Sequence, residues 1–195
     1  MQHFISLNSR YQPSYPPYLD KMSSVIRQAL KAHSRLLVVR MELWSDIDTL
    51  VNRRRNLSSS FIESLGTSLS EKTWGANTPP VKPDFLWTSD ELRPFYHAVV
   101  FLDQDMVWNS LPMHTRIPVL DSLLRGAWSK TLGLSDTPIT APVYERTRDG
   151  IFLLDESDTF IQEEINRLTW HLSDMVRDRR GVASPEARAL ESSAW

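Results

Sequence analysis

Two side chains in this sequence have the chemistry needed to hold a hard divalent metal ion. His97 lies in an apolar run that predicts a core strand, and Glu42 lies in an earlier run of the same kind. Together they could hold Mg²⁺ or Mn²⁺, which would polarise a phosphodiester bond. Asp90 or Glu91, from the charged turn before His97, would add a ligand. The competing interpretation is a structural histidine satisfied by a hydrogen bond.

Arginines in two groups are candidates for phosphate contacts. Each guanidinium presents a planar fork of donors, so these groups predict binding to single-stranded or duplex nucleic acid. The alternative is that they are solvated helix ends, because basic residues there complement the helix dipole. The six residues are Arg53, Arg54, Arg55, Arg177, Arg179 and Arg180.

The aromatic residues leave a similar choice open. The 7 tryptophans could stack on nucleic-acid bases, or they could belong to the core. Trp44, Trp87, Trp128 and Trp170 all sit in apolar patterns, which favours the core.

Composition narrows the class of protein. The absence of cysteine excludes disulfides, thiolate catalysis and sulfur-based zinc sites. No apolar run is long enough to span a bilayer and no signal peptide is evident, so we expect a soluble, cytoplasmic protein. A net charge of -2 means that nucleic acid would have to be held by a local patch. With 6 glycines and no glycine-rich motif that would hold phosphates, a nucleotide-binding loop is not expected.

The hydrophobic periodicity predicts one α+β domain in which helices pack on a mainly antiparallel sheet. Residues 1–18 are expected to form an extended arm, 19–180 the domain and 181–195 a mobile tail with little to pack. The predicted elements are a helix at 18–33, a strand at 36–44, a helix at 59–71, strands at 84–88 and 96–102, a helix at 118–132, strands at 143–145 and 151–154, and a helix at 158–177.

Three local patterns make sharper predictions. Arg40 and Glu42, two residues apart in a strand, should point to the same face of the sheet. Gly133 should end its helix in the left-handed conformation. The Asp149–Gly150 pair favours a tight hairpin between the two strands around it. The final helix is expected to bury Phe160.

Six segments, by their order and spacing, resemble the YagK/YfjJ-type, inovirus-like replication proteins of prophages and plasmids. The resemblance runs from about residue 19 to 180, and its most specific parts are the Tyr96–His97 strand and the Ala127–Trp128 helix. It implies an RRM-like, replication-initiator-like sheet, and nicking of DNA with a histidine-held metal and a tyrosine nucleophile. The segments are RLLVVRMELW, FIESLGTSL, FLWTSDELRPFYHAVVFLD, LLRGAWSKTLGL, VYERTRDGIFLLD and INRLTWHL.

The sequence departs from that family pattern at three places. Glu42 stands where the family usually has aspartate, and Phe95 stands where it tends to have a second histidine. The last helix of the family carries a tyrosine followed three residues later by a lysine, but the stretch from Arg167 to Asp174 contains neither. Because tryptophan has no oxygen to attack phosphorus, a tyrosyl-DNA intermediate is not expected from this helix.

These departures predict a mobile-genetic-element protein that keeps the scaffold, has lost nicking, and binds nucleic acid or a host protein or ribonucleoprotein complex. One version is an inhibitor of host defence of the anti-CRISPR kind. The alternative is an active metal-dependent replication endonuclease in which Tyr96 or Tyr144 replaces the nucleophile. A third interpretation is a regulatory protein that recognises DNA shape through Arg53, Arg54 and Arg55.

Overall fold

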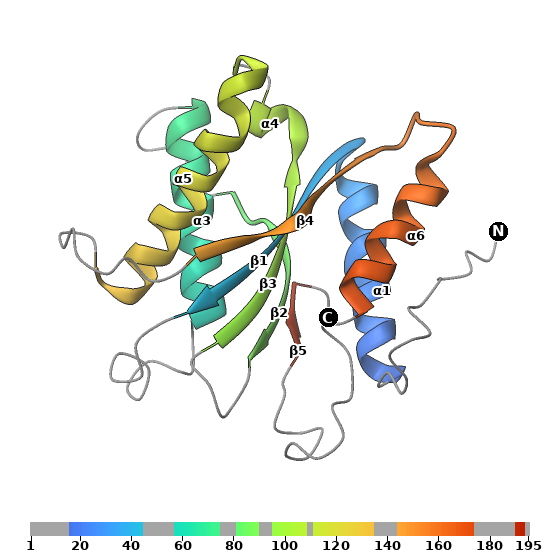
Figure 1. Cartoon of the computed structure of the whole chain (residues 1–195), viewed down its shortest axis with the longest axis horizontal. Coiled ribbons are helices and arrows are strands. Elements are labelled where there is room, and N and C mark those ends of the chain that lie inside the picture. Colours follow the sequence, from blue (N-terminus) through green and yellow to red (C-terminus); the bar gives the residue numbers. More distant parts are fainter. Residues whose placement is uncertain are drawn as a thin grey trace.

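The computed structural model describes residues 16–44, 57–74, 81–89, 95–108, 111–134, 144–173 and 190–193 (Figure 1). Strands and helices alternate along most of this chain. They are α1 (Pro16–Ala32), β1 (Arg35–Trp44), α3 (Leu57–Trp74), β2 (Asp84–Ser89), β3 (Phe95–Asp103), α4 (Gln104–Trp108), α5 (Met113–Leu132), β4 (Tyr144–Asp155), α6 (Ile161–Leu172) and β5 (Leu190–Ser192).

The strands form one five-stranded sheet in the order β4-β1-β3-β2-β5, and every pair of neighbours is antiparallel. β1 is an interior strand between β3 and β4, and β3 is the middle strand of the five. Its apolar stretch is buried from Leu36 to Val39, as expected for a strand covered on both faces. The α+β class and the antiparallel sheet are therefore confirmed.

Helices cover both faces of the sheet, α3 and α5 on one and α1 and α6 on the other (Figure 1). Alternation along β1 divides its side chains between two cores, because successive residues point to opposite faces. Leu37, Val39 and Met41 face α3 and α5, whereas Leu36 and Val38 face α1 and α6. We call these the α3/α5 face and the α1/α6 face.

The core of the α3/α5 face is built around aromatic rings. Trp128 of α5 is fully buried, and its indole Nε1 donates to the Trp44 carbonyl oxygen at 3.0 Å. The Phe61 ring lies 6.1 Å from Trp128, edge to face. Trp87 contacts both Trp128 and Tyr96, with ring centroids 6.1 and 5.2 Å apart. Trp87 and Trp128 are thus core residues, as their apolar surroundings predict.

The ends of α5 show one prediction that is confirmed and one that is wrong. Gly133 closes the helix with φ of 73°, and its amide donates to the Lys130 oxygen. The helix begins at Met113, however, so Pro118 lies inside it and not at its start. Thr115 stabilises this early turn, since both its amide and its hydroxyl donate to the Pro112 oxygen.

The predicted hairpin around Asp149–Gly150 is wrong. β4 is one strand, and both of its parts pair with β1: Ile151 lies opposite Val39, and Arg146 lies opposite Met41. Residues 147–150 are therefore an irregularity opposite Arg40. The Asp-Gly pair therefore lies in a bulge of β4. The segments of β4 before and after the bulge both pair with β1 and do not pair with each other.

Two short elements are absent from the sequence-based prediction. α4 continues directly from β3, and Asp103 Oδ1 accepts from the amides of Asp105 and Met106. β5 lies in the tail expected to pack little, yet its residues pair with β2 from Leu86 to Thr88. At the start of α6, Phe160 is 63% exposed, so the prediction that it is buried is also wrong.

Within the described ranges, no helix is both long and apolar enough to cross a membrane.

Candidate functional site

Glu42 and His97 lie side by side on the α1/α6 face. They are direct partners in the register of β1 and β3, so their side chains leave the sheet on the same side. Glu42 Oε1 is 3.6 Å from His97 Nδ1, and their side chains keep 27% and 22% of their exposure. The pair predicted from the sequence is thus brought together and partly shielded, and the Nδ1 atom of His97 is itself buried.

Arg40 connects this part of the sheet to α6. It precedes Glu42 by two residues on β1, and both face α1 and α6, as predicted. The Arg40 Nη1 group donates to the main-chain oxygen of His171 at 2.9 Å. A cation at this point complements the partial negative charge at the end of a helix. The final turn of α6 is thereby fixed to the strand that carries Glu42.

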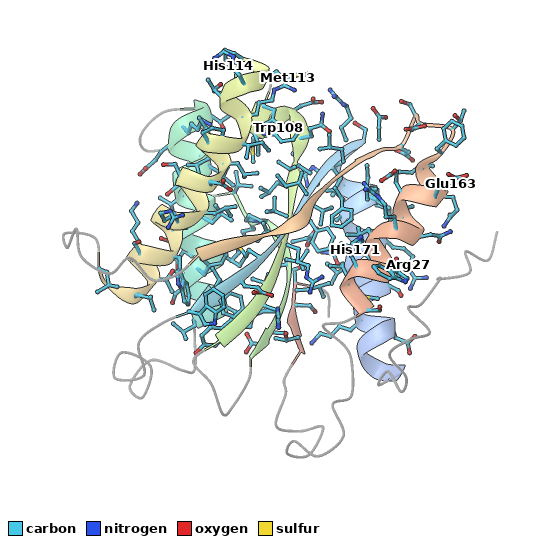
Figure 2. The ribbon with its side chains drawn as sticks, in the orientation of Figure 1. Arg27, Trp108, Met113, His114, Glu163 and His171 are labelled. Atoms are coloured by element: carbon cyan, nitrogen blue, oxygen red, sulfur yellow. The ribbon has the colours of Figure 1, made fainter. Side chains whose placement is uncertain are left out.

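The last turns of α6 present an aromatic surface. Trp170 is 42% exposed and meets the His171 ring edge to face, with centroids 4.9 Å apart. His171, labelled in Figure 2, packs in turn against Phe152 of β4 at 5.3 Å. The prediction that Trp170 belongs to the core is therefore wrong, and its indole is available for stacking.

Tyr96 cannot serve as the nucleophile of this site. It precedes His97 on β3 and therefore points to the α3/α5 face, where it is 6% exposed and packs against Trp87 and Trp128. The sheet separates its hydroxyl from Glu42 and His97. The side chain of Tyr144, the other substitute considered, lies outside the described residues.

The pair supplies a carboxylate and an imidazole, which suit a divalent ion that keeps water and substrate phosphates as further ligands. The separation of 3.6 Å exceeds hydrogen-bond length, and it leaves both donor atoms close enough together to share one ion. Among the described residues, no group of three metal-ligating side chains occurs. Asp90 and Glu91, the proposed third ligands, lie outside those residues.

The two arginine groups also lie outside the described residues, so their structure is not compared with the prediction. The exposure of Trp170 was not predicted from the sequence. The feature that indicates it is the position of Trp170 on the polar side of the amphipathic helix α6.

Comparison with known proteins gives one match. A family model for the YagK/YfjJ C-terminal domain matches residues 2–188, which includes every element described here except β5. No curated protein and no solved structure matches the chain. The resemblance carried by the six segments is thus confirmed, and the chain belongs to the YagK/YfjJ C-terminal domain family.

Proposed function

We propose that this protein is a mobile-genetic-element protein that keeps a replication-initiator-like scaffold and binds nucleic acid without nicking it through a tyrosine. The observation that carries the proposal is the pairing of Glu42 with His97 on the α1/α6 face, beside a helix α6 that contains no tyrosine from Ile161 to Leu172.

The topology supports the scaffold. The chain order β1-α3-β2-β3-α5-β4 and the sheet order β4-β1-β3-β2 are the orders that we would expect of an RRM-like scaffold built on a split βαβ plan. Here α1 and α6 are added on the face opposite α3 and α5 (Figure 1). Because a fold alone does not fix function, the assignment depends on the side chains of the α1/α6 face.

Those side chains favour binding over covalent chemistry. A transesterifying nuclease needs a hydroxyl that attacks phosphorus and leaves a phosphotyrosine. Trp170 offers only carbon and an N–H group, and Tyr96 faces the opposite core. An exposed indole is instead well suited to stacking on a base, which contributes about 1–3 kcal/mol per base in nucleic-acid complexes.

The test is to incubate the purified protein with end-labelled single-stranded and duplex DNA and Mn²⁺ or Mg²⁺, and to run native and denaturing gels side by side. We expect a shifted band on the native gel and an intact, adduct-free strand on the denaturing gel. A covalent adduct that survives denaturation would overturn the proposal.

A substitution at the aromatic surface sharpens this test. Trp170→Ala should weaken binding about 5-fold to 150-fold, the equivalent of one lost stacking contact. Met113→Ala is the matched control, since Met113 is 80% exposed on α5 and lies outside the site. Equal effects of both substitutions would remove Trp170 from the binding surface.

A second candidate function is a metal-dependent replication endonuclease. The close approach of His97 Nδ1 to Glu42 Oε1 favours it, because the two side chains could hold an ion against a phosphate. It requires that His97→Ala abolish metal-dependent cleavage while Trp170→Ala does not. Undiminished cleavage by the His97→Ala protein would exclude it.

The binding target could also be a host protein or ribonucleoprotein complex, as for an anti-defence inhibitor of the anti-CRISPR kind. Exposed apolar side chains favour this version, and they include Met113, Leu153, Phe160 and Trp170. Capture of one defined host complex by the wild-type protein, lost on substitution of Phe160 and Trp170, is the result it requires.

A further inference from the structure

One side of α1 carries a stripe of cationic and polar side chains outside the apolar core. Lys21, Ser24, Arg27 and Lys31 follow one another at intervals of three or four residues, which places them on one side of a helix, and Gln28 is adjacent to Arg27. Arg27, Gln28 and Lys31 are exposed. With a rise of about 1.5 Å per residue, the stripe is about 15 Å long.

Three hollows adjoin this stripe and join into one groove. The first two, about 720 and 680 Å³, share Ser24 and Arg27. The third, about 640 Å³, shares Gln28 with one of them and Ser59 and Phe85 with the other. We call this the α1 groove: α1 forms one wall, α3 forms the other, and the β2–β5 edge of the sheet forms the floor.

The α1 end of the groove is suited to anions. The hollow lined by Ser24, Arg27, Gln28, Lys31 and Ala32 has two cations and no carboxylate on its walls. Arg27 is labelled in Figure 2 on α1, on the same side of the sheet as His171.

Carboxylates do line the other two hollows, and half of them are already hydrogen-bonded. Asp84 Oδ1 accepts from Gln28 Nε2 at 2.8 Å, and Glu191 accepts from the Ser58 hydroxyl. Asp20 and Glu63 line only hollows other than the one with Arg27 and Lys31. Negative charge therefore lies in two of the three hollows, and the hollow lined by both Arg27 and Lys31 has none.

The third hollow has a different character. Ile62, Pro83 and Phe85 give it apolar walls, and Ser59 and Ser193 add hydroxyl groups. Its volume of about 640 Å³ lies within the range of about 300–1,000 Å³ usual for small-ligand sites. A flat ring with polar edges fits such a space, whereas a base held inside a duplex cannot enter it.

We propose that the α1 groove is a binding site for single-stranded nucleic acid, separate from the Glu42–His97 pair. The phosphates of the strand lie along Arg27 and Lys31, and an unstacked base enters the hollow walled by Ile62 and Phe85. This inference rests on the proposed function, because it names a second surface by which the same nucleic acid is held.

The test is fluorescence anisotropy with a labelled single-stranded oligonucleotide, competed by unlabelled single strand or duplex, at several salt concentrations. The Arg27→Gln/Lys31→Gln protein should lose two phosphate contacts, which lowers the salt slope by about 1.4 and affinity at 0.1 M salt by about 25-fold. The matched control is Lys72→Gln/Lys130→Gln, which removes two exposed charges from α3 and α5 on the opposite face.

The outcomes separate this inference from the proposed function. Selective loss in the Arg27/Lys31 protein, with single strand competing better than duplex, supports the α1 groove. Wild-type affinity in that protein, or equal competition by duplex, overturns the groove and leaves nucleic-acid binding itself intact. If the wild-type protein binds no oligonucleotide, both proposals are wrong.

Discussion

Arg40 joins β1 to the last turn of α6 by donating to the His171 carbonyl oxygen at 2.9 Å. The same strand holds Glu42 two residues later, so one segment of β1 both carries the candidate site and fixes the helix that borders it. Figure 1 shows α6 covering the sheet beside α1. The bond from Arg40 thus holds the end of α6 together with the buried Leu168 and Leu172 and the contact between the His171 and Phe152 rings.

Arg40→Met should lower the free energy of unfolding by about 1.5–3 kcal/mol, the usual contribution of a hydrogen bond to a charged group. Methionine keeps much of the side-chain volume and removes the donor. Urea denaturation measures the loss, and Arg27→Met, which removes an exposed arginine on α1, is the control. Equal stability of the two variants would mean that the bond to His171 contributes nothing.

Gly66 and Gly126 should respond oppositely to substitution by alanine. Both lie within helices, α3 and α5, where alanine is favoured over glycine by about 1 kcal/mol. At Gly126 an added Cβ meets nothing within 4 Å, so Gly126→Ala should stabilise by about that amount. At Gly66 the Cβ would overlap the Val81 carbonyl oxygen, so Gly66→Ala should destabilise the protein.

Thermal unfolding of the two variants checks this pair. The expected result is a higher midpoint for Gly126→Ala and a lower one for Gly66→Ala, relative to wild type. A stabilised Gly66→Ala protein would show that the segment from Val81 to Pro83 does not pack closely on α3.

The comparison of sequence and structure shows where periodicity is informative. β1, α3 and the pair β2–β3 follow from apolar patterns, because a buried strand, or a helix with one buried side, has apolar residues at regular spacing. The alignment of Glu42 with His97 depends on the register between β1 and β3, which the sequence of either strand does not encode.

The errors arise where tertiary pairing overrides a local signal. Asp149–Gly150 is a good hairpin turn in isolation, yet the residues before and after it both pair with β1. β5 is too short to give a periodic signal, and it exists because β2 offers an open edge. Trp170 is apolar but exposed, which hydrophobicity alone does not predict.

The turn after β4 should make stability sensitive to acid. The Ser157 hydroxyl and amide both donate to Asp155 Oδ1, at 2.6 and 2.9 Å, and these bonds hold the pKa of Asp155 below its usual value of 3.8. Arg35, 3.5 Å away, acts in the same direction. A lowered pKa means that the ionised group stabilises the fold above about pH 4, and that this contribution is lost as pH falls through the folded-state pKa.

Asp155→Asn should therefore be less stable than wild type at neutral pH, and the difference should shrink as the pH falls below 3.8. Urea midpoints between pH 2 and 7 measure it. Glu156→Gln is the control, because it removes a neighbouring exposed carboxylate and leaves the bonds between Asp155 and Ser157 in place. A difference that stays constant across this range would exclude ionisation of Asp155 as its cause.

Two tryptophans provide a direct comparison of core and surface. Trp128→Phe removes a buried N–H group and leaves the Trp44 carbonyl oxygen without that donor, together with a cavity. We expect a loss of about 2–4 kcal/mol from the lost hydrogen bond and the missing ring volume. Trp170→Phe, at a position 42% exposed, should change stability by less than about 0.5 kcal/mol.

Denaturant titration followed by circular dichroism measures both variants independently of tryptophan fluorescence. If Trp170→Phe proved as destabilising as Trp128→Phe, Trp170 would belong to the core, and its assignment as an exposed stacking surface would be wrong.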